Sequence, residues 1–281
     1  MFEKIRSEFL IGKALVKQNA FDGRAFSFDF KQTKDSIKGV LTAKCDLDMK
    51  SFEIECEKDF EDDDLFFANG YQAWTTSREF SKDDKFDGLI KAANINKFLK
   101  HFAGLSGDYH FESYGEEGKF HSYTYCYFRE KGERKIKLYG SRSERNGFTI
   151  FAVDMKNDKF IIRKDVEGLH LKAGQTYEIF DIAIIEGDMD DVMDKYFFDF
   201  IGCKKPEIKH LSGYTSWYNY FQNISEEFII RDLNGLDRAG EEVNIFQVDD
   251  GYQAAVGDWL VTDKKKFPNG MKYIADKIHE K

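Results

Sequence analysis

The spacing of the hydrophobic residues changes near residue 186, and this change divides the chain into two parts. Before that point apolar and polar residues alternate, most clearly in the runs 26–30, 52–56, 123–127 and 136–138. Successive side chains of a strand point to opposite faces, so each run presents one apolar face. Gly174 precedes a further long run that ends near Gly187. The pattern predicts an antiparallel β-sandwich over residues 1–186, with one helix at about 89–102.

Residues 187–209 have helical spacing and are predicted to form a linker helix and a connector. Asp188 is a favourable N-cap, and the apolar residues that follow fall on one face of a helix. Gly202 ends the run, and Pro206 lies in the connector.

From residue 210 to residue 281 the pattern reads strand, helix, strand, helix. The strands are predicted at 211–217 and 243–250, the second one covered on both faces because nearly every position is apolar. Ser225 and Gly270 mark the helix starts. This alternation predicts parallel strands with right-handed crossovers, as in the first two βα units of a (β/α)8 barrel. Two units cannot close such a barrel, so we expect the sequence to be the front portion of a longer protein.

Composition excludes several classes of protein. The chain has 281 residues, of which 16% are aromatic, too many for a disordered protein. Its 42 basic and 51 acidic residues give a net charge of −9, which argues against nucleic acid as a partner. Charges interrupt the first sixteen residues, so these form neither a signal peptide nor a membrane span. The four cysteines lack the spacing of a zinc or redox motif. We therefore expect a cytoplasmic protein without a membrane partner.

Polar and aromatic residues follow both predicted strands of the second part. Ligands of parallel α/β folds bind beyond the carboxyl ends of the strands. Asp249 and Asp250 end the second strand, and Trp217 ends the first. Carboxylates accept hydrogen bonds from sugar hydroxyls, and an indole ring stacks on the apolar face of a sugar. A divalent-metal site, or solvated acids that cap the next helix, would also fit. Neighbouring acids are poorly placed to flank a scissile bond, so they are predicted to bind substrate and not to cleave it.

The segments 211–227 and 244–281 resemble the start of the catalytic barrel of glycoside hydrolase family 36 α-galactosidases, the melibiases. The family pattern is GW-x-SWY-x-YF, then FQIDDG[WY], GDWL and FP-x-G. The matching residues are Trp217, Asp249, Asp250, Gly257, Asp258, Trp259, Phe267 and Pro268. Residues 69–74, NGYQAW, resemble the N-G-[WYF]-Q-S-W element of the family's amino-terminal β-sandwich. Tyr214 and Ala73 replace a Trp and a Ser of these patterns.

The resemblance implies a role for each matching residue. Asp249 and Asp250 would bind the C4 and C6 hydroxyls of galactose, and Trp217 would line the same pocket. Trp74 would reach the sugar from the sandwich, although an ordinary core position is an equal alternative. Asp258 and Trp259 would shape the mouth of the site. The implied substrate is a small α-galactoside of the melibiose or raffinose type, with no metal or organic cofactor.

The implied mechanism is retaining hydrolysis, with an aspartate nucleophile and an aspartate acid/base. Both would lie beyond Lys281, so no catalytic residue is expected in this chain and no hydrolase activity from it alone. An α-N-acetylgalactosaminidase or a raffinose-type transglycosylase remains an alternative, and so does a non-catalytic carbohydrate-binding protein. The family's members often self-associate, and an acidic chain is compatible with a homo-oligomer.

Overall fold

The computed structural model describes residues 1–70, 77–85, 116–207, 210–238 and 243–281. The helix predicted at 89–102 lies outside these residues. The chain divides into two compact units, Met1–Lys204 and Lys205–Lys281. The domain boundaries expected at residues 186 and 209 stay a prediction. None of the described helices has the length and apolar character needed to cross a membrane.

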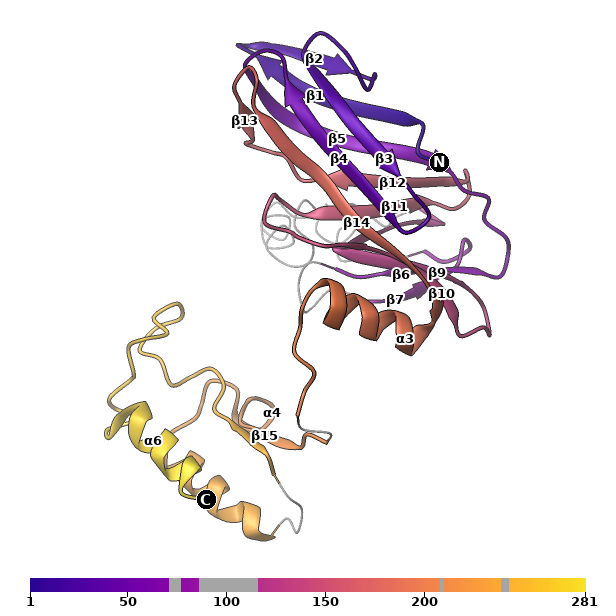
Figure 1. Ribbon diagram of the computed structural model, residues 1–281. Coiled ribbons are helices and arrows are strands. Elements are labelled where there is room, and N and C mark those ends of the chain that lie inside the picture. Colours follow the sequence, from indigo (N-terminus) through magenta and orange to yellow (C-terminus); the bar gives the residue numbers. More distant parts are fainter. Residues whose placement is uncertain (71–76, 86–115, 208–209, 239–242) are drawn as a thin grey trace. The chain divides into compact units, whose positions relative to one another are not determined.

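Two antiparallel sheets form most of the first unit (Figure 1). The first sheet has the order β2-β1-β5-β12-β11-β8, with β13 beside β5, and the second has the order β3-β4-β14-β10-β9-β6-β7. The prediction of a β-sandwich is confirmed. The strands are β1 (Lys4–Ile11), β2 (Ala14–Gln18), β3 (Phe26–Gln32), β4 (Ser36–Ala43), β5 (Leu47–Glu57), β6 (Asp64–Ala68), β7 (Arg78–Phe80), β8 (Lys119–Tyr123), β9 (Tyr125–Glu130), β10 (Lys135–Ser141), β11 (Thr149–Asp154), β12 (Lys159–Lys164), β13 (His170–Leu171) and β14 (Thr176–Asp188).

The alternating residues build the core between these two sheets. Phe26 and Phe28 of β3 are buried, as are Phe52 and Ile54 of β5. The rings of Phe28 and Phe52 meet edge to face, with centroids 4.8 Å apart. Such pairs stabilise a core beyond the area that they bury. The apolar residues of the alternating runs thus lie on the face of each strand that points into the core.

The alternation predicted one strand at 123–127, but the structure has two. Tyr123 ends β8 in the first sheet, and Tyr125 begins β9 in the second. Thr124, between them, has a left-handed backbone with φ of +69°. A single residue in this conformation turns the chain from one sheet to the other, and residue periodicity does not reveal such a crossing.

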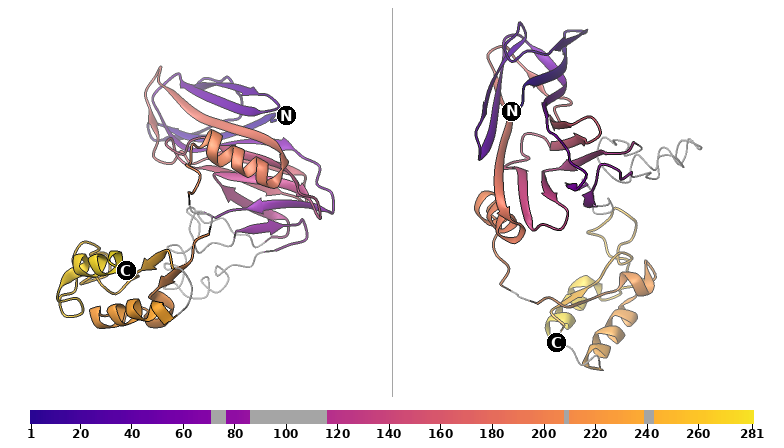
Figure 2. Two further views of the ribbon diagram at one scale, coloured as in Figure 1. Left: turned by 60° about the horizontal axis from the view of Figure 1, so that its bottom comes forward. Right: turned by 90° about the vertical axis from the view of Figure 1, so that its right-hand side faces the viewer.

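A helix packs on the outer side of the second sheet (Figure 2). It comprises α3 (Met189–Asp194) and a π-helical continuation, η1 (Lys195–Phe200). The Asp188 side chain caps it by accepting the N–H of Asp190, as predicted. Tyr196 is fully buried and donates its hydroxyl to the carbonyl of Ser141 at 2.6 Å. A Cβ at Gly140 would lie 2.6 Å from Cζ of this ring, so the close approach requires glycine.

The second unit has the predicted order of strand, helix, strand and helix. Its elements are β15 (Gly213–Thr215), α4 (Trp217–Tyr220), α5 (Glu226–Gly235), η2 (Leu236–Arg238), β16 (Ile245–Gln247) and α6 (Gly270–His279). The two strands are parallel, as predicted. Ser225 caps α5 by accepting the N–H of Phe228. Ile229 of α5 and Ile274 of α6 share a buried cluster with Phe267.

Both strands of this unit are shorter than predicted. Trp217 does not end a strand but begins the short helix α4. Ile245 of β16 is 43% exposed, so the prediction that this strand is covered on both faces is wrong. In the described part of the unit β15 is the one strand that pairs with β16, and it leaves part of β16 open.

Candidate functional site

Trp217 and Asp249 lie just beyond the carboxyl ends of the parallel pair, two residues after β15 and β16 respectively. Figure 1 labels β15 and α4 in this part of the chain. Thr215 is paired with Gln247 in the register of the two strands. Trp217 follows Thr215 by two residues, and Asp249 follows Gln247 by two residues. The two residues therefore lie at the same height along the parallel pair. Neighbouring strands are about 4.8 Å apart, which brings both residues to one edge of the sheet.

Ser216 joins the two strand ends. It is fully buried, and its N–H donates to the carbonyl of Gln247 at 3.2 Å. Its hydroxyl accepts the N–H of Asp249 at 3.0 Å. Sequence reasoning missed this residue, although its place directly before Trp217 in the SWY motif was a signal.

Hydrogen bonds from neighbouring residues of the same turn orient the carboxylate of Asp249. One oxygen accepts the side-chain N–H of Gln247, and the other accepts the backbone N–H of Asp250, both at 2.8 Å. An ionised carboxylate has about four acceptor positions, so both oxygens can accept further hydrogen bonds. Among the described residues neither Asp249 nor Asp250 pairs with a Lys or Arg side chain. The two half-buried acids thus present an acceptor surface that suits hydroxyl groups and repels anions.

Gly251 brings the two turns of this site into contact. Its φ is +110°, a conformation that favours glycine. A Cβ at this position would overlap the carbonyl oxygen of Gln222 and lie 2.8 Å from that residue's Cα. The N–H of Gly251 donates to the side chain of buried Gln253 at 2.8 Å. The glycine after the two acids is therefore a packing requirement.

Trp217 is half-buried and rests on Phe221. The two rings meet edge to face, with centroids 5.3 Å apart. Phe221 has a positive φ of +50°, which is uncommon for a bulky residue. This arrangement leaves part of the indole open to a ligand.

Two of the predicted site residues lie in a separate loop after the turn of the acids. Asp258 and Trp259 lie in the loop enclosed by the bridge between Gln253 and Thr262. The Trp259 side chain is 51% exposed, and its carbonyl accepts the hydroxyl of Tyr252 at 3.2 Å. Backbone hydrogen bonds also close the base of the loop, from the N–H of Ala254 to the carbonyl of Val261 and from the N–H of Asp263 to the carbonyl of Tyr252, both at 2.8 Å.

Two further points concern Trp74 and metal binding. Trp74 lies outside the described residues, so its predicted role stays a prediction. In the described ranges no group of three or more His, Cys, Asp or Glu side chains could hold a metal ion.

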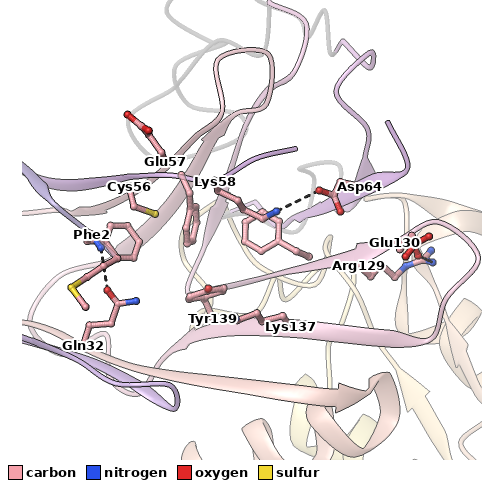
Figure 3. A pocket seen from close by; sticks show the side chains of 13 residues that line it. Phe2, Gln32, Cys56, Glu57, Lys58, Asp64, Arg129, Glu130, Lys137 and Tyr139 are labelled. Carbon is pink, nitrogen blue, oxygen red and sulfur yellow. Dashed lines mark hydrogen bonds and ion pairs between the residues drawn. The ribbon is translucent and has the colours of Figure 1, made fainter. Parts of the chain in front are cut away.

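A cavity of about 480 Å³ lies in the first unit (Figure 3). Lys58 pairs with Asp64 at 3.4 Å, and its ammonium lies 4.9 Å from the ring centroid of Phe128. Burial raises the pKa of the Cys56 thiol to about 11, so this thiol is a weak nucleophile at neutral pH. None of the predicted site residues lines this cavity.

Several known proteins similar to this chain are named α-galactosidases. No family model matches the chain. An α-galactosidase of Saccharomyces paradoxus is 33% identical over 78 residues, which cover 24% of this chain and 15% of the yeast protein. The fold is similar to that of an α-galactosidase from Thermus thermophilus, solved in complex with stachyose, with a TM-score of 0.51 and 19% identity. That match covers 98% of this chain and 49% of the Thermus chain.

A second similar structure is the GH36 α-galactosidase of Geobacillus stearothermophilus, with a TM-score of 0.53 and 11% identity. It covers 95% of this chain and 38% of the Geobacillus chain. The chain thus spans at most about half the length of the proteins that it matches. The resemblance predicted from the motifs is confirmed at the level of the fold: this chain has the fold of the amino-terminal portion of GH36 α-galactosidases.

Proposed function

We propose that the chain belongs to glycoside hydrolase family 36 and is the amino-terminal portion of an α-galactosidase. It would supply the β-sandwich (1–186), the connecting helix (187–209) and the first two βα units of the (β/α)8 barrel (210–281) of a cytoplasmic protein. The fold and the ordered motifs support this proposal. The observation that carries it is the position of Asp249 and Trp217 at the same level beyond two parallel strands.

The ligand in this proposal is the terminal galactose of a small α-galactoside. Asp249 and Asp250 accept hydrogen bonds from its C4 and C6 hydroxyls, and Trp217 covers an apolar face of the ring. Galactose differs from glucose in its axial C4 hydroxyl. A glucoside would leave an acceptor unpaired, which is costly in a partly buried site. A solved Thermus thermophilus relative holds p-nitrophenyl α-D-galactopyranoside, with a TM-score of 0.52 and 18% identity to this chain.

Under this proposal the chain binds the substrate but does not cleave it. The nucleophile and the acid/base lie outside these 281 residues, as the family resemblance implies. Turnover of an aryl α-galactoside by the purified 281-residue chain would contradict this part of the proposal.

The test is a calorimetric titration of the chain with methyl α-D-galactopyranoside and methyl α-D-glucopyranoside. We expect saturable binding of the galactoside, with the glucoside much weaker. Asp249→Asn should weaken galactoside binding by about 1.5–3 kcal/mol, or roughly tenfold to a hundredfold, because a charged acceptor is lost. Asp276→Asn is the matched control, since Asp276 is exposed on α6 and pairs with Lys272. Equal affinity for the two sugars, or an unchanged affinity in Asp249→Asn, would refute the proposal.

A further inference from the structure

The side chain of Lys266 links the two turns that carry the candidate site. Its ammonium group donates to the carbonyl of Gln222 at 2.9 Å and to the carbonyl of Gly251 at 3.0 Å. Gln222 lies in the turn that follows α4, the short helix that begins with Trp217, and Gly251 directly follows the two acids. Hydrogen bonds from a charged donor are stronger than those between neutral groups.

The backbone around Lys266 is itself held in place. The Lys266 carbonyl accepts the N–H of Glu226, the first residue of α5, at 2.9 Å. The Lys266 N–H donates to a carboxylate oxygen of Asp263 at 3.4 Å. The next residue, Phe267, is fully buried. The lysine therefore extends from a fixed point, unlike a solvated surface lysine.

The two turns need such a restraint. Phe221, the neighbour of Gln222, has a positive φ, and such backbone strain persists only where surrounding contacts impose it. Gly251 also packs directly against the backbone of Gln222. The hydrogen bond from Lys266 is made to Gln222, which follows the strained Phe221 and packs against Gly251.

We infer that Lys266 is a positioning residue for the sugar site. It holds the turn of Asp249 and Asp250 against the turn of Trp217, so that the acids and the indole face the same ligand. The identity of that ligand rests on the proposed function, whereas the contact between the turns does not.

Amide hydrogen exchange of the chain, followed by NMR, tests the contact. Lys266→Met removes the donors and keeps an unbranched stem. Lys266→Arg keeps a charged group with enough N–H donors for both carbonyls, and Lys265→Met changes an exposed neighbour as the control. In Lys266→Met the amides of Phe221 and Gly251 should exchange roughly tenfold faster, while amides in the middle of α5 keep their rates. Both other variants should match the wild type.

A galactoside titration of the same variants tests the consequence. Lys266→Met should bind methyl α-D-galactopyranoside roughly tenfold more weakly, because a misplacement near 1 Å is costly in an oriented site. Lys266→Arg should restore the affinity. Unchanged exchange in Lys266→Met, or faster exchange throughout the second unit, would overturn the inference. If the wild-type chain binds no galactoside, the proposed function fails, and the exchange rates still decide for or against the contact.

Discussion

Replacing Gly251 with alanine should destabilise the second unit through two separate effects. The first is conformational, because a φ of +110° costs a residue with a Cβ about 1–3 kcal/mol. The second is steric, because the new Cβ would overlap the Gln222 carbonyl oxygen and lie 2.8 Å from the Cα of that residue. The neighbour here is backbone and cannot rotate away, so overpacking adds about 1–3 kcal/mol. The two effects together amount to about 2–6 kcal/mol.

Gly257→Ala separates the two effects. Gly257 has a φ of +98°, close to that of Gly251, but a Cβ there would meet nothing within 4 Å. This control should show the conformational cost alone. The difference between the two variants, about 1–3 kcal/mol, measures the contact between the two turns of the site.

Urea unfolding followed by tryptophan fluorescence provides the assay. A Trp74→Phe background confines the signal to Trp217 and Trp259, which both lie in the second unit. With an m-value of about 1 kcal/mol/M for a unit of this size, the two midpoints should differ by about 1–3 M. If the midpoints of the two alanine variants coincide, Gly251 is not packed against Gln222, and the account of the site is wrong.

Three further predictions concern stability. Hydrogen bonding from Arg129 holds the pKa of Glu79 below its usual 4.5, so the pair stabilises the fold above about pH 4.5 and loses this effect as the pH falls through the lowered pKa. Glu79→Gln should therefore lower the melting temperature at pH 7, and this difference should shrink as the pH falls through the lowered pKa, as calorimetry would detect. Ser225→Ala removes the cap of α5 and should cost about 1 kcal/mol in urea unfolding of the second unit. Tyr196→Phe leaves the buried carbonyl of Ser141 without its hydroxyl donor and should cost the first unit about 1–3 kcal/mol, whereas an equal midpoint in urea would contradict the bond.

Local signals predicted the elements that depend on local physics. Helix caps involve residues only two or three positions apart, so Asp188 and Ser225 could be identified directly. The long strand after Gly174 was also predicted, and β14 runs from Thr176 to Asp188. Strand alternation depends on the immediate neighbours in the same way. These signals were sufficient to predict the sandwich and the parallel pair.

The roles of the candidate site residues stay a prediction. Asp249, Asp250 and Trp217 could be singled out from the sequence because residues after parallel strands gather at one edge of the sheet. Ser216 and Lys266 were missed, since their partners lie 33 and 44 positions away in the chain. Spacing along a sequence carries no information about such a pair until the fold brings it together.

The sequence by itself determined the antiparallel sheets, the parallel pair of strands, the starts of the main helices and the two acids after the second parallel strand. Tertiary structure alone decided that the chain changes sheets at Thr124, that Ile245 is left partly open, and that Lys266 reaches two carbonyls at once. The physical reason is that periodicity and capping act within a few residues, whereas burial and hydrogen bonds between distant turns depend on what the completed fold places beside each group.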